Sequence, residues 1–418
     1  MRGAIDFLRA DPRLAFYGLF MAFGSSFGQT FFISQFGGEI RRDFALSDAA
    51  FGTIYGLGTL LSAAVIVYTG GIIDRVDLRR WTLILLPGCA IACALMGLAQ
   101  GPVTLFLAIF LLRQTGQGLM SHTMGHSLGR YSLVGRGKAI AFGGYGFPLG
   151  EALFPVLGVA VIAAFGWREA WYGLSGLYLF LGLPIALWLL QGHDGRYALY
   201  KQDLADQDAQ DQLAEADLSR PRPVRSWRRK DVVRDPRFYL ALPGLMCPSY
   251  IVTGLLLHGV RIAELKGWSP ELWAGSVVFY AIGSIPAGLM MGAYIDRKGA
   301  ARGLPLFLGP LIIGCIVLAL GTGAWTPPVF MLCCGITSGM TAVLLVALWV
   351  EAYGRRFLGE IKAMMTALAV LASAAAPPTL GWMLNADWSV AQLCLFCGAL
   401  AMIGCSLSLP AARRYATP

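Results

Sequence analysis

Two ionisable side chains, Arg113 and Glu151, stand deep inside long apolar stretches of this sequence. Arg113 belongs to the stretch 103–126 and Glu151 to the stretch 139–164. Because a helix rises about 1.5 Å per residue, both groups would lie near the middle of a membrane. An ionisable group there costs at least about 2.5–3.5 kcal/mol, which makes each a candidate functional residue. We expect Arg113 to attract an anion and Glu151, on a facing helix, to carry or gate a proton. An inert structural bridge is the alternative.

Polar side chains elsewhere in the apolar stretches could line a solute cavity. Gln29 is the most persuasive of them, because a buried amide in lipid needs a hydrogen-bond partner. For any single one of these residues, hydrogen bonding between helices is the commoner explanation. The predicted cavity residues are Ser26, Gln29, Thr30, Gln117, Tyr250, Tyr280, Thr337 and Thr341, with Gln114, Ser249 and Thr253 beside them.

Other chemistries find little support in the sequence. His122 and His126 stand four residues apart, a spacing that suits a metal, but no third ligand is identifiable near them. All nine cysteines, Cys394 and Cys397 included, fall inside apolar stretches, where a free thiol acts as a small hydrophobe. The sequence has no phosphate-binding Gly-Lys-Ser/Thr loop and no nucleophile–base–acid constellation. We expect no metal, no cofactor and no enzymatic activity.

Composition places most of the chain in lipid. Of its 418 residues, 56% are hydrophobic and 14% are charged, whereas soluble domains carry about 25% charged residues. A bilayer core about 30 Å thick requires about 20 apolar residues per helix. The predicted fold class is therefore all-α, a polytopic membrane protein. Twelve transmembrane helices are predicted, at 14–36, 51–70, 81–100, 103–126, 139–164, 168–190, 237–259, 272–292, 304–322, 327–350, 362–384 and 388–410.

Basic residues are distributed unevenly between alternate connections. With the N-terminus on side one, that side carries 27 Lys and Arg, the other side carries 5, and Arg113 is the last of the 33. The positive-inside rule then places both termini in the cytoplasm. The N-terminal stretch predicts a short interfacial helix before an uncleaved first span. The net charge of +9 is thus a topology signal, and we expect no nucleic-acid partner.

Two charged turns repeat one another across the chain. They read Gly70-Gly-Ile-Ile-Asp-Arg-Val-Asp-Leu-Arg-Arg80 and Gly292-Ala-Tyr-Ile-Asp-Arg-Lys-Gly-Ala-Ala-Arg302, and each follows a long apolar run. They resemble the Gly-x-x-x-Asp-Arg/Lys-x-Gly-x-Arg/Lys-Arg/Lys loops of the major facilitator superfamily, between helices 2 and 3 and between helices 8 and 9. The first copy has Asp77 in place of the second Gly, and the second copy has Ala301 in place of one terminal base.

The resemblance implies two related six-helix halves, 1–190 and 237–418, joined by a cytoplasmic linker, 191–236, with a site near mid-membrane between the halves. It also implies that the carboxylates of the turns bond the start of a helix in the opposite half and hold the outward-open state. Charged turns that serve topology alone are the alternative. The predicted latch residues are Gly70, Asp74, Arg75, Arg79, Gly292, Asp296, Arg297 and Glu351, the last expected to pair with Arg297 or with Arg355 and Arg356.

Two further stretches are similar to motifs of this family. Arg113-Gln-Thr-Gly-Gln-Gly118 resembles the Arg–Gly motif of helix 4, which is associated with proton coupling. Gly143-Gly-Tyr-Gly-Phe-Pro-Leu-Gly-Glu151 looks partly like the Gly-Pro motif of the family's antiporters. It is also similar to the Gly-rich helix 5 of its monocarboxylate and oxalate/formate carriers.

These features predict a secondary active transporter of the cytoplasmic (inner) membrane that works by alternating access. It would move a small organic solute, an anion such as a carboxylate, together with protons. Its expected partners are the solute, protons and membrane lipid, and we expect a monomer. Proton-driven efflux of amphipathic drugs or metabolites is one alternative. A non-transporting membrane sensor or scaffold that has kept the fold is the other.

Overall fold

The computed structural model describes residues 6–132, 135–202, 227–354 and 357–416, and within these ranges it contains helices and no strands. Over the described residues, ten helices are long and apolar enough to cross a membrane, and they coincide with ten of the predicted spans. The other two are helical in part. The first predicted span, 14–36, is an interrupted helix. The ninth, 304–322, contains a shorter apolar helix, Gly309–Leu320. The prediction of an all-α polytopic membrane protein is confirmed.

The helices form two groups along the chain, and residues 193–202 between them are also helical. The first group contains α1 (Asp6–Ala10), α2 (Pro12–Gly24), η2 (Ser25–Gly28), α3 (Thr30–Ile33), η3 (Ser34–Phe36), α4 (Gly37–Asp43), α5 (Asp48–Thr69), η4 (Gly70–Asp74), α6 (Leu78–Gly97), α7 (Pro102–Leu112), η5 (Arg113–Met120), α8 (Ser121–Tyr131), α9 (Arg136–Gly144), α10 (Gly146–Phe165), α11 (Trp167–Gly176), η6 (Leu177–Gly182) and α12 (Leu183–Leu189). The second group contains α14 (Arg229–Val232), α15 (Pro236–Leu257), α16 (Gly259–Lys266), α17 (Pro270–Ser276), α18 (Val278–Lys298), η7 (Ala301–Gly303), α19 (Gly309–Leu320), α20 (Thr326–Tyr353), α21 (Leu358–Asn385) and α22 (Val390–Ala416).

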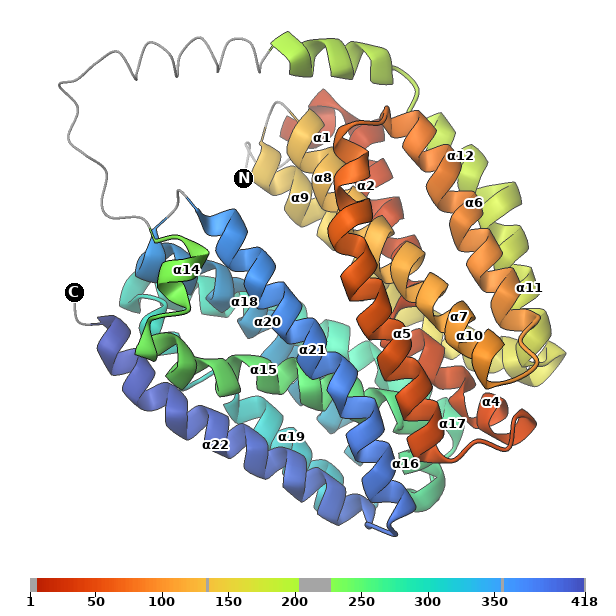
Figure 1. The fold of residues 1–418 in the computed structure, drawn as a ribbon, viewed down its shortest axis with the longest axis vertical. Coiled ribbons are helices and arrows are strands. Elements are labelled where there is room, and N and C mark those ends of the chain that lie inside the picture. The colour runs from red at the N-terminus through yellow and green to blue at the C-terminus, as the bar shows by residue number, and fades with distance from the viewer. Residues whose placement is uncertain (1–5, 133–134, 203–226, 355–356, 417–418) are drawn as a thin grey trace.

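The two groups lie side by side, with α5 of the first running along α21 of the second (Figure 1). Gly52 and Gly56 permit this close approach, because a Cβ at either position would collide with a backbone carbonyl oxygen of α21. A second seam joins α10 to α17 and α18. We call the end with the α4–α5 and α16–α17 connections the closed end. The opposite end, where α2 begins and α22 ends, is called the termini end.

The first predicted span is interrupted at Gln29, whose backbone is extended (φ −86°, ψ 154°) between η2 and α3. Gly28 immediately before it packs on η5, where a Cβ would overlap the carbonyl oxygen of Leu112. The facing residue is Gly116, whose own Cβ would lie 2.9 Å from the Gly28 Cα. Glycine on both sides thus lets the two backbones touch at the interruption.

The fourth span changes from α-helix to π-helix at Arg113 and returns to α-helix at Ser121. π-Helical turns are rare and occur frequently at functional sites, because the wider turn reorients side chains. Here the wide turn lies against the interruption of the first span. Two irregular backbone segments therefore meet inside the first group.

The described N-terminal part of the predicted linker packs on the first group. Arg196 donates to Asp11 at the start of α2, with Nη2 2.8 Å from Oδ1. Asp194 accepts two hydrogen bonds from Arg79, at 2.9 and 3.1 Å. Arg79, predicted as a latch residue, is thus engaged by the segment 193–202. The middle of the linker lies outside the described residues.

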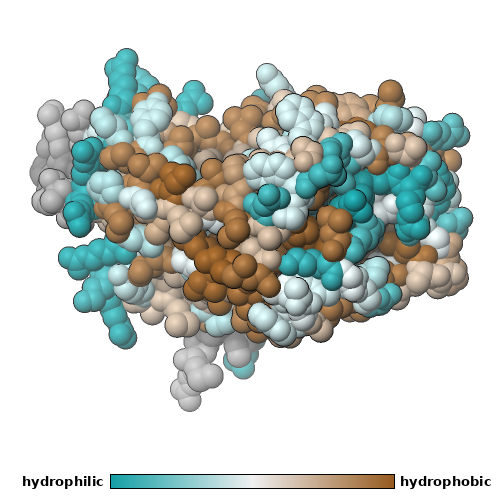
Figure 2. Space-filling model, turned by 90° about the horizontal axis from the view of Figure 1, so that it is seen from below, coloured by the Kyte–Doolittle hydropathy of each residue, from teal (hydrophilic) through white to brown (hydrophobic). Residues whose placement is uncertain are grey.

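The surface is consistent with a membrane protein. Figure 2 shows hydrophobic side chains over the middle of one face, with hydrophilic side chains gathered toward its two ends. Large apolar side chains are exposed along the spans, among them Ile84, Phe180 and Leu289. Such exposure is expected where lipid tails rather than water cover the helices.

Candidate functional site

Arg113 is almost completely buried, with 3% of its surface exposed, and neutral groups hold it. Its Nη1 lies 3.4 Å from the Gly28 carbonyl oxygen and 3.4 Å from Thr30 Oγ1. The guanidinium carbon stands 5.3 Å from the ring centre of Tyr55, a cation–π distance. Among the described residues, Nε has no hydrogen-bond partner and no carboxylate pairs with the side chain. The guanidinium therefore keeps both charge and donor capacity for a ligand.

The interruption at Gln29 explains how the first span can hold Arg113. The last carbonyls of a helical segment lack partners within it, so the end of η2 offers the Gly28 oxygen as an acceptor. The next residue after Gln29 is Thr30, whose hydroxyl also bonds Tyr55 at 2.7 Å. Tyr55 is fully buried on α5. These groups orient the guanidinium without neutralising it.

Glu151 lies in a separate, smaller cavity of about 140 Å³, and it does not pair with Arg113 in this structure. Among the described residues, no ion pair or hydrogen bond to its carboxylate is present. The Arg113–Glu151 pair that a structural bridge would require is therefore not formed here, since Arg113 turns instead to the acceptors at the helix interruption. The small cavity is also lined by Gln29, Thr30, Gln117, Thr253 and Tyr280, among others.

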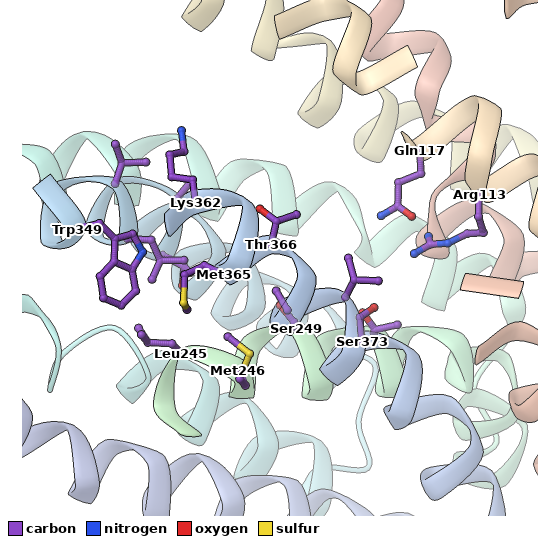
Figure 3. Close-up of a pocket in the computed structure, with 17 residues that line it drawn as sticks. Arg113, Gln117, Leu245, Met246, Ser249, Trp349, Lys362, Met365, Thr366 and Ser373 are labelled. Carbon is purple, nitrogen blue, oxygen red and sulfur yellow. The ribbon is translucent and has the colours of Figure 1, made fainter. Parts of the chain in front are cut away.

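The larger cavity, about 390 Å³, lies between the two groups and extends from Arg113 toward the termini end. Figure 3 shows Arg113 and Gln117 at one end of it, and Trp349 and Lys362 toward the other. The first group supplies only Arg113 and Gln117 to its wall, whereas α15, α20 and α21 supply the rest. Of the described residues that line it, two are cationic and none is a carboxylate. Its wall thus combines cationic side chains with apolar ones.

The structure separates the predicted cavity residues into two sets. Gln29, Thr30, Gln117 and Tyr280 line the small cavity, and Gln117 and Thr341 line the large one. Gln117 and Thr253 belong to both, so the cavities are neighbours.

Three of the predicted cavity residues line neither of these two cavities. Ser26 packs against Gly150 at a helix crossing, so closely that a Cβ on the glycine would overlap its hydroxyl. Tyr250 bonds Thr379 on α21, with the two hydroxyl oxygens 2.5 Å apart. Thr337 is completely buried in α20. These side chains serve helix packing, the commoner role for isolated polar residues in membrane helices.

The predicted latch residues lie at the termini end, and those whose side chains the structure describes form no latch across the groups. Asp296 and Arg297 are exposed, and among the described residues neither forms an ion pair or a hydrogen bond with the first group. Glu351 accepts a hydrogen bond from the Ala300 backbone N–H at 2.8 Å rather than pairing with Arg297. It thereby fixes the turn after α18. The side chain of Asp74 and residues 355–356 lie outside the described part of the chain.

Asp77 replaces a glycine of the family-like turn, and the structure assigns it a capping role. Its carboxylate accepts a hydrogen bond from the Arg79 backbone N–H at 2.9 Å at the start of α6. It also stands 3.5 Å from His193 Nε2. A carboxylate at a helix N-terminus satisfies otherwise unpaired N–H groups.

A cluster of charged residues at the closed end joins the two groups, and sequence reasoning did not identify it. Asp48 of α5 is paired with Arg41 at 2.7 Å within its own group. Across the seam it lies 3.3 Å from Arg261 Nε and 3.9 Å from His258 Nδ1. Arg41 in turn lies 3.8 Å from Glu264. The spacing of His258, Arg261 and Glu264, three residues apart on one helix face, was the available signal.

Replacing Asp48 with Asn is expected to weaken the closed end. The carboxylate is buried, and its loss leaves Arg41 and Arg261 with Glu264 as their one shared carboxylate among the described residues, at a cost of about 1–3 kcal/mol. The distance between spin labels at Ala45 and Glu271, measured by double electron–electron resonance, should therefore show a larger population of long values. The exposed Asp43→Asn variant of the same connection is the control for general loosening. An unchanged distance distribution in Asp48→Asn would show that the cluster does not hold the groups together.

Acidification is expected to open the closed end through His258. Burial lowers the pKa of His258; the Pro377 carbonyl, 2.9 Å from Nε2, and the Asp48 carboxylate oppose this shift, and Arg41 adds to it. The closed arrangement thus favours neutral His258, whereas an exposed histidine has a pKa of about 6.5. The stability that neutral His258 gives to the closed arrangement is fully present above pH about 6.5. It is lost as the pH falls through the lowered pKa of His258. The same label pair should report opening between pH 7.5 and 5. A His258→Gln variant should lose this pH dependence, and an identical profile in the variant would contradict the assignment.

Comparisons with known proteins give a family and a fold. A family model described as the Major Facilitator Superfamily matches residues 18–377. Among solved structures, the chain is similar to a bacterial homolog of the human lysosomal transporter Spinster in an inward-facing and unoccupied conformation, with 14% identity, a TM-score of 0.70, and coverage of 97% of this chain and 98% of that one. The inward-facing, occupied conformation matches with 15% identity, a TM-score of 0.66, and coverage of 95% and 96%. No curated protein sequence matches this chain.

Proposed function

This chain belongs to the major facilitator superfamily, and from that premise we propose that it transports a small organic anion together with protons. Family and fold indicate a secondary transporter that uses alternating access, rather than an enzyme. The identity of the solute class and of the coupling ion is our proposal. Both rest on the two neighbouring cavities between the helical groups.

The observation that carries the anion proposal is the charge of the large cavity. Arg113 lies at its deep end with no carboxylate beside it, and Lys362 lies toward the termini end. A buried cation without an ion-pair partner is costly unless a ligand supplies the opposite charge. The hydroxyls of Ser249, Thr253 and Ser373 on the wall offer further donors. A carboxylate at Arg113 would supply the opposite charge that the guanidinium lacks.

Glu151 is proposed as the proton carrier. Among the residues that the structure describes, it is the one carboxylate on the walls of the two cavities. Since no cation lies beside it among the described residues, it can take up and release a proton without breaking an ion pair. Its cavity lies between the solute cavity and the closed end, so it would meet the other side of the membrane when that end opens.

The termini end is proposed to face the cytoplasm, because the basic residues gather in the connections on that side. The structure would then be inward-facing, with the closed end at the outer surface of the cytoplasmic membrane. The charged turns at Asp74 and Asp296 would act as a latch in the opposite state. Among the described residues, Asp296 forms no ion pair or hydrogen bond with the first group, which agrees with a latch that has been released.

The proposal predicts stabilisation by carboxylates in a thermal-shift screen of the purified protein. At 100 times the dissociation constant, a ligand adds about 2.7 kcal/mol to the free energy of unfolding. Benzoate and benzamide make a matched pair, since they differ in charge but little in shape. A carboxylate series should shift the melting temperature, and the corresponding amides should not. Equal shifts from both members of every pair would refute recognition of an anion.

Export of amphipathic compounds remains the second candidate, favoured by the apolar floor of the large cavity. Met246, Met365 and Trp349 belong to that floor, and methionine and tryptophan suit adaptable apolar contacts. Cationic amphiphiles included in the same screen decide between the two. Stabilisation by those compounds and not by carboxylates would support export of amphipathic compounds.

A further inference from the structure

A second large cavity lies away from the solute site, on the periphery of the first group. It has a volume of about 450 Å³ and is lined by apolar side chains of the first span, α10 and α11. The spans containing α10 and α11 are the least buried in the described structure, at 22% each. This face is therefore directed toward the bilayer. A cavity of such composition does not retain ordered water.

Two glycines open this cavity between α10 and α11. A Cβ at Gly173 would meet nothing within 4 Å, and a Cβ at Gly158 would lie 3.2 Å from the ring of Phe32. The floor is aromatic: the rings of Phe27 and Phe154 have centroids 4.4 Å apart, and those of Phe27 and Phe32 are 5.1 Å apart. An empty space here would forfeit the dispersion contacts that a hydrocarbon chain would supply.

A carboxylate stands at the rim of the cavity. Glu169 lies in the first turn of α11 at the closed end, is exposed, and has no ion-pair partner among the described residues. Its neighbour Arg168 is already bound to Asp43, and Trp167 Nε1 donates to the same carboxylate at 2.9 Å. Tryptophan at this level is typical of the membrane–water boundary. Glu169 is thus placed where lipid head groups lie.

We propose that the cavity is a binding site for one membrane phospholipid whose head group carries a primary amine. An acyl chain would fill the space over the phenylalanines, and the ammonium group would pair with Glu169. The rim carboxylate disfavours an anionic head group. The site has a mechanical consequence, because Phe32 lies two residues after Thr30, which holds Arg113. The lipid would support the interrupted helix from behind. This inference does not depend on the identity of the solute.

Native mass spectrometry of the delipidated full-length protein tests this proposal. Phosphatidylethanolamine, phosphatidylcholine and phosphatidylglycerol are added in turn at equal concentration. We expect one retained phosphatidylethanolamine, held about tenfold more tightly than the other two lipids. Gly173→Leu should fill the cavity and reduce retention about tenfold. Gly176→Leu, on the same helix but outside the lining, should retain lipid as the wild type does.

Glu169→Gln separates the head group from the tail. It should still retain lipid but lose the preference for the primary amine. A monodisperse elution profile and an unchanged melting temperature in lipid-free detergent show that each variant is folded. Equal retention of all three lipids by the wild type would overturn the proposal, and so would wild-type retention by Gly173→Leu. Retention that falls equally in Gly176→Leu would also overturn it.

Discussion

Replacing Arg113 with Ala is expected to weaken binding of the anionic solute strongly. Arg113 is the buried cation at the deep end of the large cavity, and it donates only to neutral groups at 3.4 Å. Hydrogen bonds to charged groups are worth about 1.5–3 kcal/mol each, so affinity should fall at least ten- to a hundredfold. Equilibrium binding of the best carboxylate from the thermal-shift screen measures this loss. Binding of that carboxylate to Arg113→Ala with wild-type affinity would remove Arg113 from the site.

Lys362 provides a matched control within the same cavity. It is also cationic, but it is exposed and lies toward the termini end. An exposed charge contributes mainly through long-range attraction, which salt screens. Lys362→Ala should therefore change affinity by about two- to threefold, and only at low ionic strength. Arg113→Lys should fall between the two, since lysine keeps the charge but lacks the planar fork of donors.

Much of the fold could be predicted from apolar segment lengths and the repeated charged turns. The deep charges were found for the same reason: an ionisable residue in the middle of an apolar run is rare. Arg113, Glu151, Gln29 and Gln117 do line the two cavities between the groups. Composition could not show which groups each of these side chains contacts.

The missing information was backbone geometry. Facing positions for Arg113 and Glu151 were expected from their equal depth on neighbouring helices, which assumes regular α-helices. The interruption at Gln29 and the π-helix from Arg113 to Met120 break that assumption. Both depend on a close approach of Gly28 and Gly116, two of the 52 glycines in the sequence. No pattern within a single segment distinguishes these two from the rest.

The cluster at the closed end was missed for a different reason. Arg41, Asp48, His258 and Glu264 each look like an ordinary charge at the end of a span. They come from two groups more than two hundred residues apart, and only the packing of α5 against α21 and of α4 against α16 brings them together. Ion pairs between the two helical groups can be recognised from the sequence only when the relative positions of both groups are already known.

Replacing Glu151 with Gln is expected to separate proton coupling from solute exchange. Gln has the size and hydrogen-bonding capacity of a protonated carboxyl group but cannot release a proton. Since Glu151 forms no ion pair among the described residues, its neutralisation strands no opposite charge, and the variant should fold. Solute exchange in liposomes should stay within about two- to threefold of the wild type, while accumulation driven by a pH gradient should fall at least tenfold.

The decisive measurement compares two assays on the same liposomes containing Glu151→Gln. One follows uptake of labelled solute driven by an imposed pH gradient, and the other follows exchange of labelled for unlabelled solute without a gradient. Glu271→Gln, an exposed carboxylate on α17, should behave as the wild type in both assays. A loss of both activities in Glu151→Gln would assign Glu151 to solute binding. Accumulation at the wild-type level would show that the proton moves through a group other than Glu151.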